Sequence, residues 1–270
     1  GIGVNGWVKV NGEKMSKSLG NMIPLSEISN KHGSDASRIT ILSGGEGLDD
    51  PNWDTKFAEM MENKLSQLYE FSIKNYNKGT LKKREIDKWM ELELNKIIKE
   101  TEEFMEKTLF RSAIQKGFFD LQRALKWYLR RTENPNKETM NRIIEIQTLI
   151  MSPFAPFISE EIWQKIKKKN FICLEKWPKI KKLKYTGNED YIKNVLNDIN
   201  SILRLVKFKP KKIYLYTIPT EKKILEESKD FFEREFNLEF SIFSVNDKNK
   251  YDPKEKSSKS KKDKPSIYIE

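Results

Sequence analysis

The sequence predicts a mainly α-helical chain that opens with a β-hairpin and ends in a small α/β domain. Between residues 54 and 169, apolar side chains recur at i, i+3 and i+4, the spacing of amphipathic helices. Before them, residues 7–10 alternate apolar and polar and lead into Asn11 and Gly12, the strongest two-residue hairpin signal. Near the end, residues 211–216 alternate in the manner of a strand.

Composition and charge indicate a polyanionic partner, with simple solubility as the alternative. Lys and Arg number 51 against 40 Asp and Glu, which gives a formal net charge of +11 at pH 7. This excess fits RNA better than a membrane, because no stretch approaches the ~18 apolar residues of a spanning helix. The lone Cys173 excludes an internal disulfide and favours a cytoplasmic location, and with the lone His32 it cannot form a metal site. We therefore expect no membrane partner and no protein-bound metal.

Residues 14–18, Lys-Met-Ser-Lys-Ser, follow the hairpin directly, so two lysines lie on a segment free to move at the mouth of a rigid turn. Phosphoryl and nucleotidyl transfer need positive charge where negative charge develops in the transition state. Lys is a compact charge on a flexible stem, and Ser16 and Ser18 add hydrogen-bond donors. Gly20 lets backbone N–H groups approach an anion. A solvated loop without a ligand is the alternative interpretation.

The pentapeptide resembles the KMSKS signature of the class I aminoacyl-tRNA synthetases. The hairpin before it (residues 6–13, Gly-Trp-Val-Lys-Val-Asn-Gly-Glu) and Gly20 and Asn21 after it fit the same family. The resemblance implies that the loop closes over ATP, which binds with Mg²⁺. It also implies that Lys17 stabilises the transition state of amino-acid adenylation while Lys14 assists. The implied ATP-binding residues are Lys14, Met15, Ser16, Lys17 and Ser18.

After the loop, the sequence predicts two short helices, a linker and five longer helices. The first short helix covers about 26–31, and the second runs to about 42 with Ser34 and Asp35 as its N-cap. Residues 48–54 are expected to be a linker, whose Asp54 caps the first long helix. The long helices are expected at about 54–77, 89–105, 110–131, 137–151 and 157–169. Amphipathic helices joined by short loops form a bundle.

This bundle, residues 51–170, resembles the anticodon-binding domain of class I synthetases. Residues 151–163 (Met-Ser-Pro-Phe-Ala-Pro-Phe-Ile-Ser-Glu-Glu-Ile-Trp) match a segment common to the leucine, isoleucine, valine and methionine branch. Residues 1–50 are then the end of the catalytic domain. The cations of this bundle that could face tRNA phosphates are Arg123, Lys126, Arg130 and Arg131. They could equally form a solvated helix face.

A basic connector, residues 171–187, leads to the small α/β domain, residues 188–270. We expect a helix over about 190–208, a strand over 211–216 and a helix that Thr220 caps and that runs to about 235. A second strand is expected over 238–243. The lysine-rich segment 247–264 is low in complexity and is expected to be mobile. Residues 265–270 form a short extended end.

Three stretches resemble leucyl-tRNA synthetases of the archaeal and eukaryotic-cytosolic type: residues 44–54, residues 209–217 and the final Ile-Tyr-Ile-Glu. In that family the C-terminal domain contacts the long variable arm of tRNA-Leu. Leu19 departs from the family, which often has Lys there, and the lysine-rich segment replaces a more apolar approach to the terminus. The implied tRNA-binding residues are Lys207, Lys209, Lys211, Lys212, Ile269 and Glu270, because lysines pair with phosphates and a chain end can read exposed bases.

The sequence therefore predicts the C-terminal part of a leucine-specific synthetase, as a fragment or as one subunit of a split enzyme. We expect the chain alone to be inactive, because the second class I signature (the His-x-Gly-His type) lies outside these residues. Its expected partners are tRNA-Leu and the N-terminal catalytic half. The alternatives are a valine, isoleucine or methionine enzyme of the same branch, and a non-catalytic tRNA-binding or scaffold protein derived from a synthetase. The presence of Lys14 and Lys17 argues against the scaffold.

Overall fold

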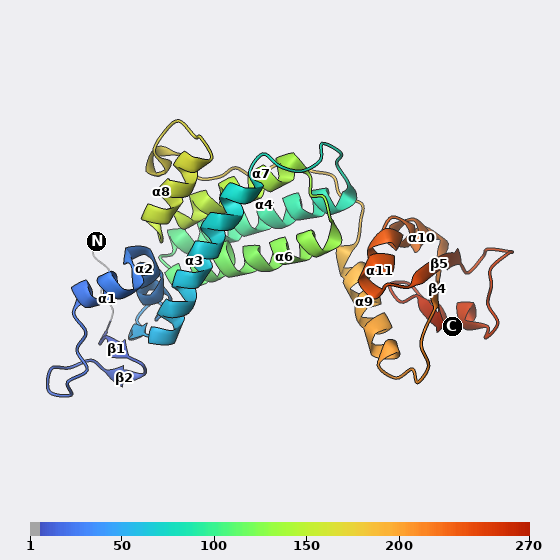
Figure 1. The fold of residues 1–270 in the computed structure, drawn as a ribbon, viewed down its shortest axis with the longest axis horizontal. Coiled ribbons are helices and arrows are strands. Elements are labelled where there is room, and N and C mark those ends of the chain that lie inside the picture. The colour runs from blue at the N-terminus through green and yellow to red at the C-terminus, as the bar shows by residue number, and fades with distance from the viewer. Residues whose placement is uncertain (1–5) are drawn as a thin grey trace. The chain divides into compact units, whose positions relative to one another are not determined.

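The computed structural model describes residues 6–270, which divide into two compact units between Lys184 and Tyr185. Helices dominate the first unit, and the second combines a three-stranded sheet with helices (Figure 1). The predicted mainly α-helical class with a small α/β domain is therefore confirmed. The division falls inside the predicted connector 171–187. Within the described part of the chain, no helix is long and apolar enough to cross a membrane.

The predicted hairpin is present and belongs to a small sheet. β1 (Lys9–Val10) pairs antiparallel with β2 (Glu13–Lys14) and parallel with β3 (Asn52–Trp53). Asn11 and Gly12 have φ values of 51° and 90°, which the two-residue turn requires. The expected linker 48–54 thus contains a strand, because backbone N–H groups of the hairpin donate to carbonyl oxygens of this segment at 2.7 and 2.8 Å.

Two short helices follow the loop, as predicted, but the N-cap between them was wrong. α1 (Leu25–His32) ends at Gly33, whose φ of 77° suits glycine, and α2 (Ser34–Ser43) begins directly after it. Ser34 is the first helical residue, and the Asp35 carboxylate binds backbone N–H groups at the start of α8 (Pro156–Lys165) instead. Asp35 therefore caps a helix that lies more than a hundred residues away in the sequence.

The bundle contains the five predicted helical stretches. Its elements are α3 (Thr55–Asn75), α4 (Glu85–Glu106), α5 (Phe110–Ile114), the π-helix η1 (Gln115–Asp120), α6 (Leu121–Arg131), α7 (Lys137–Met151) and α8 (Pro156–Lys165). Asp54 caps α3 as predicted, since its Oδ1 accepts from the Phe57 N–H at 3.0 Å. α8 ends four residues before the predicted 169, because Lys167 adopts a φ of 62° that ends the helix.

The stretch 110–131 was predicted as one α-helix, whereas its middle is the π-helix η1. Gly117 of η1 packs against α7 and α4 so closely that a Cβ there would collide with Ile150 Cγ2. The π-helical turn is wider than an α-helical turn and places Gly117 at this contact. The apolar residues on both sides of the turn still face the core of the bundle. Periodicity counted at 3.6 residues per turn does not reveal such a local change of pitch.

The connector begins with the short 3₁₀-helix η2 (Ile172–Leu174), and polar side chains of the bundle then hold it. Asn95 of α4 donates to the Lys181 carbonyl at 2.6 Å and accepts from the Lys181 N–H at 2.9 Å. Arg142 of α7 donates to the Lys179 carbonyl at 2.9 Å. The connector is therefore bound to the first unit almost to the point where the second unit starts.

The second unit has a mixed sheet in the order β5-β4-β6. Its elements are α9 (Glu189–Leu203), β4 (Lys212–Thr217), α10 (Pro219–Glu226), α11 (Lys229–Phe236), β5 (Glu239–Ser244), the 3₁₀-helix η3 (Lys256–Lys259) and β6 (Ser266–Ile269). The predicted strands are confirmed. The single helix predicted from Thr220 to 235 is two helices, and it begins at Pro219 rather than at a Thr220 cap, because the ring of proline suits the first helical position. α9 ends at Leu203, before the predicted 208.

The two faces of this sheet differ. Ile213 and Leu215 are fully buried, and Thr217 on the same face is joined to Tyr191 of α9 at 3.0 Å between hydroxyl oxygens. Phe240 of β5 pairs with Ile213 and stacks on Phe232 of α11. Alternate residues of a strand point to opposite faces. The helices therefore cover this face, and Tyr214 and Tyr216 belong to the other one.

Candidate functional site

The side chain of Asn21 holds the signature loop, which we define as residues 14–21. Its Oδ1 accepts from the Ser16 N–H at 2.9 Å, and its Nδ2 donates to the Lys14 carbonyl at 3.0 Å. Inside the loop, the Leu19 N–H donates to the Ser16 Oγ at 3.2 Å. The backbone of the loop is therefore closed into a defined turn by a residue outside the pentapeptide.

Met15 attaches the loop to the body of the first unit. Its N–H donates to the Val8 carbonyl at 3.0 Å. Its side chain packs against a buried cluster from the hairpin, α1, β3 and α3, made of Val10, Ile28, Trp53 and Ala58. The root of the loop is thus fixed by apolar packing, while its tip is exposed.

The two lysines of the loop have different surroundings. Lys14 Nζ lies 3.7 Å from the centroid of the Trp7 ring, and that ring is 66% exposed. Lys17 is exposed, and within residues 6–270 its ammonium has neither an ion pair nor a hydrogen bond. The hydroxyl oxygens of Ser16 and Ser18 lie 3.1 Å apart. The predicted ATP-binding residues thus lie on one turn, with Lys17 as the cation that has no competing partner.

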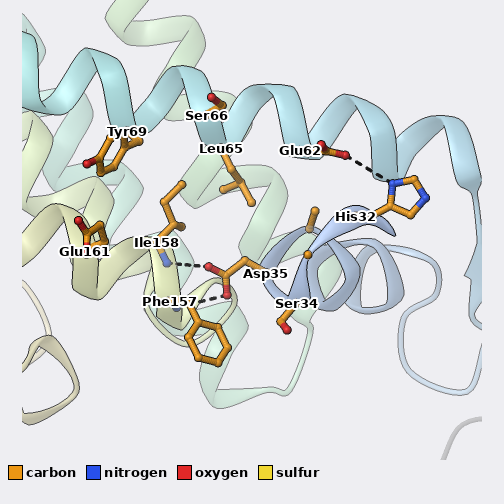
Figure 2. A pocket seen from close by; sticks show the side chains of 12 residues that line it. His32, Ser34, Asp35, Glu62, Leu65, Ser66, Tyr69, Phe157, Ile158 and Glu161 are labelled. Carbon is orange, nitrogen blue, oxygen red and sulfur yellow. Dashed lines mark hydrogen bonds and ion pairs between the residues drawn. The ribbon is translucent and has the colours of Figure 1, made fainter. Parts of the chain in front are cut away.

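A groove of about 550 Å³ lies among α1, α2, α3 and α8 (Figure 2). Within it, the Asp35 carboxylate accepts from the N–H groups of Phe157 and Ile158 at 3.3 and 2.7 Å. Burial raises the pKa of the Asp35 carboxyl, and these two N–H donors act against that rise. The buried His32 places its Nδ1 3.6 Å from Glu62 Oε2. No residue of the signature loop lines this groove, so it is separate from the predicted ATP site.

The predicted cations of α6 lie toward solvent. Arg123, Lys126 and Arg130 are exposed. Arg123 pairs with Asp120, and the Arg130 guanidinium lies 5.8 Å from the centroid of the Trp127 ring. Arg123 and Arg130 therefore have partners within the bundle and also reach the surface. Among residues 6–270, no group of three or more His, Cys, Asp or Glu side chains is placed to hold a metal ion.

The predicted tRNA-binding lysines surround the start of β4. Lys207, Lys209 and Lys211 are exposed in the segment that leads to the strand. Lys212 Nζ lies 3.4 Å from Glu239 Oε2 and 5.5 Å from the centroid of the Tyr214 ring. Four lysines within six positions thus give this edge of the second unit positive charge, and only the last of them is paired with a carboxylate in the described structure.

The two predicted tRNA-binding residues at the chain end, Ile269 and Glu270, differ in the exposure of their side chains. Ile269 is only 9% exposed and lies beside Ile213 in the sheet, so its side chain belongs to the core. Glu270 is exposed, and its backbone carbonyl accepts from the N–H groups of Lys211 and Lys212. Its carboxylate accepts from the Tyr214 hydroxyl at 3.2 Å. Glu270 can therefore offer a side chain to a ligand, whereas Ile269 can offer only its backbone.

Sequence reasoning missed an aromatic cluster on the open face of the sheet. Its rings come from all three strands and from the lysine-rich segment: Tyr214, Tyr216, Phe243, Tyr251 and Tyr268. The alternation of Tyr214 and Tyr216 could have indicated a shared face. Tyr251 gave no such signal, because it lies in a segment without periodicity.

Comparison with known proteins matches two stretches of the chain to family models of tRNA ligases. Residues 2–54 match the family model of class I tRNA synthetases for I, L, M and V, and residues 87–215 match the anticodon-binding domain of tRNA ligase. A solved structure of the LeuRS of Agrobacterium radiobacter K84, in a ternary complex with tRNA and LeuAMS, matches with a TM-score of 0.55 at 22% identity. That match covers 78% of this chain and 25% of the solved chain, and it supports the fold.

Curated relatives agree on the amino acid. The chain is 37% identical over 213 residues to the leucine–tRNA ligase of Aeropyrum pernix, covering 76% of this chain and 22% of the relative. It is 33% identical over 247 residues to that of Pyrococcus horikoshii, covering 86% and 26%. It is 36% identical over 228 residues to that of Methanocaldococcus jannaschii, covering 80% and 24%. The chain spans about a quarter of the length of these relatives. The predicted resemblance to archaeal leucyl-tRNA synthetases is confirmed, and the chain belongs to the class I tRNA synthetases.

Proposed function

We propose that this chain supplies the ATP-clamping loop and the tRNA-binding parts of a leucine–tRNA ligase. The complete reaction would be ATP-dependent activation of leucine and transfer of the leucyl group to tRNA-Leu, in the cytoplasm. The observation that carries the proposal is the signature loop, because its backbone is fixed by Asn21 and Met15 while Lys17 stays without a partner in residues 6–270.

In the activation step, a carboxylate oxygen of leucine bonds to the α-phosphorus of ATP while the bond to the pyrophosphate oxygen breaks. Negative charge then grows on the leaving pyrophosphate, which Mg²⁺ accompanies as part of the substrate. Lys17 offers an ammonium to this charge, and Lys14 adds a second one when its side chain swings from the Trp7 ring. The hydroxyl groups of Ser16 and Ser18 can donate to the same phosphates. A leucine pocket is expected in the remaining length of the synthetase.

For tRNA, charge and position support three contact regions. The exposed Lys207, Lys209 and Lys211 suit phosphates, because each released counterion strengthens binding at low salt. The outer edge of β6 leaves backbone groups for base edges, which suits a role for Ile269 through its backbone alone. The bundle offers the exposed cations of α6 as a further contact region.

The test is leucylation of tRNA-Leu by this chain mixed with a separately produced N-terminal part of a leucine–tRNA ligase. We expect the mixture to charge tRNA-Leu, and a tRNA-Leu with a shortened variable arm to be charged less efficiently. We expect the chain alone to catalyse no leucine-dependent pyrophosphate exchange, and exchange by the chain alone would contradict that expectation. Charging with valine, isoleucine or methionine in place of leucine would identify another enzyme of the branch. Binding of tRNA without restored charging would favour the non-catalytic RNA-binding alternative.

A further inference from the structure

The open face of the C-terminal sheet carries an aromatic cluster for which the proposed chemistry has no use. Tyr214 of β4 lies beneath two other rings, with centroid distances of 5.0 Å to Tyr251 and 5.8 Å to Tyr268. Phe243 of β5 stacks against Tyr214 and Tyr216 at interplanar angles of 10° and 19°. Helices cover the opposite face, so this arrangement is additional to the core that holds the unit together.

Burial within the cluster decreases from Tyr216 through Tyr214 to Tyr251. Tyr216 is fully buried and donates its hydroxyl to the Tyr251 carbonyl at 2.5 Å, which fixes the backbone that carries the outermost ring. Tyr214 is nearly buried, whereas Tyr251 is 45% exposed. Tyr268 stands beside Tyr251 with its centroid 6.5 Å away and its plane tilted by 51°. A tyrosine ring held open on a rigid aromatic base is the arrangement on which nucleic-acid bases stack.

The segment that carries Tyr251 is strongly basic. We call residues 247–264 the strap; it contains eight lysines and four acidic residues. Its backbone is tied down, because the Asp252 carboxylate accepts from the N–H groups of Lys256 and Ser257 at 2.7 and 2.9 Å. The Ser260 hydroxyl donates to the Tyr216 carbonyl at 2.7 Å. The strap was expected to be mobile, and that stays a prediction, but these hydrogen bonds fix the backbone of a segment in which eight lysines accompany the exposed Tyr251.

We propose that the exposed face of Tyr251, with Tyr268 as a side wall, is a stacking site for an unpaired RNA base, and that the strap lysines contact the neighbouring phosphates. A stacking ring beside clustered positive charge meets both needs of single-stranded nucleic-acid binding. The Glu270 carboxylate is fixed by the Tyr214 hydroxyl and lies beside the cluster. As an acceptor it can bind an N–H group on the edge of a stacked base. This inference rests on the proposed function, since it names one contact of the bound tRNA.

The test uses the complete chain and a tRNA-Leu that carries 2-aminopurine at an unpaired position of its long variable arm. Stacking on tyrosine quenches this fluorophore. We expect wild type and Tyr251→Phe to quench it and to bind equally well, because phenylalanine keeps the ring. Tyr251→Leu keeps apolar bulk but removes the aromatic face. It should abolish the quenching and weaken binding by roughly 5- to 150-fold, the range of one base–aromatic stack.

Two controls separate stacking from other effects. Phe171→Leu changes an exposed aromatic residue of the first unit and should leave both readouts unchanged. A second tRNA with 2-aminopurine in its anticodon loop should give a signal that does not depend on Tyr251. Equal quenching and equal affinity for Tyr251→Leu and wild type would overturn this inference while leaving the proposed function intact. Failure of the wild-type chain to bind tRNA-Leu would overturn both.

Discussion

The signature loop and the strap are both short Lys/Ser segments that one polar side chain holds in place. Asn21 binds the backbone of the loop on both sides of Met15, and Asp252 binds two N–H groups of the strap. At the tip of the loop, a single ammonium group, that of Lys17, is left alone. In the strap, eight lysines share the segment with one exposed ring, that of Tyr251.

This difference teaches how similar composition can serve different purposes. A single ammonium group on a fixed backbone can be positioned beside the negative charge that develops at one atom group in the transition state. Transition-state stabilisation needs such positioning. Dispersed charge beside an aromatic ring gives affinity without such placement, because phosphates and bases are repeated along an RNA strand. Two experiments test whether the two segments divide these tasks as proposed, and a third measures how firmly the start of the strap is held.

The largest expected effect is that of Lys17→Ala in the reassembled enzyme. The rate of leucine-dependent pyrophosphate exchange should fall by about 10²- to 10³-fold, the usual loss on removing one charge-stabilising donor. The dissociation constant for tRNA-Leu should stay nearly unchanged. Lys262→Ala, which removes an exposed lysine of the strap, should leave exchange intact. If both variants kept full exchange activity, the proposed role of Lys17 would be wrong.

The next effect concerns the two side chains that hold the segments. Asn21→Ala removes two hydrogen bonds of about 1 kcal/mol each, so leucine activation should fall by roughly tenfold or more. Asp252→Ala should instead weaken tRNA binding by a comparable factor and spare activation. Pyrophosphate exchange and tRNA binding, measured on both variants, form a two-by-two comparison. A loss of activation in Asp252→Ala would show that the segments do not act separately.

The smallest effect is a pH dependence at the start of the strap. A hydrogen bond from Lys222, at 2.9 Å, and one from the Ser244 N–H hold the pKa of the Asp247 carboxyl below its ordinary value of 3.8. The folded state therefore binds this proton less tightly than the unfolded chain does. The stabilisation is complete above about pH 3.8 and is lost as the pH falls through the lower folded pKa.

Asp247→Asn should flatten this acid limb of the stability curve slightly, because an ion pair at the surface contributes little. Urea unfolding followed between about pH 2.5 and pH 6 measures the free energy of unfolding in both proteins. An acid limb of the same slope in both would show that Asp247 carries none of the dependence.

Features set by neighbouring residues could be predicted from the sequence. The turn at Asn11 and Gly12, the cap at Asp54 and the bounds of α7 all follow from local rules. The signature loop was visible as a spaced set of residue types. Its support by Asn21 is also local, only seven positions from Lys14.

Features that join distant parts of the chain could not be predicted. β3 exists because it pairs with β1 more than forty residues earlier, and Asp35 caps a helix that starts at Pro156. The π-helix changes the helical pitch only locally, which a fixed period does not detect. Tyr251 enters the aromatic cluster from a segment with no pattern at all. Each of these contacts depends on the folded arrangement of the chain.

Besides shaping the hairpin, the turn at Asn11 and Gly12 connects the hairpin that precedes the signature loop to the bundle. The Oδ1 of Asn11 accepts from the N–H of Thr55, the first residue of α3, at 3.1 Å, and the Gly12 N–H donates to Asn52 Oδ1 at 2.8 Å. The hairpin turn before the signature loop is therefore joined directly to the first residue of α3 by the Asn11 side chain. In an enzyme with the proposed function, a tilt of α3 on tRNA docking would also move the hairpin from which the signature loop, with Lys17, begins.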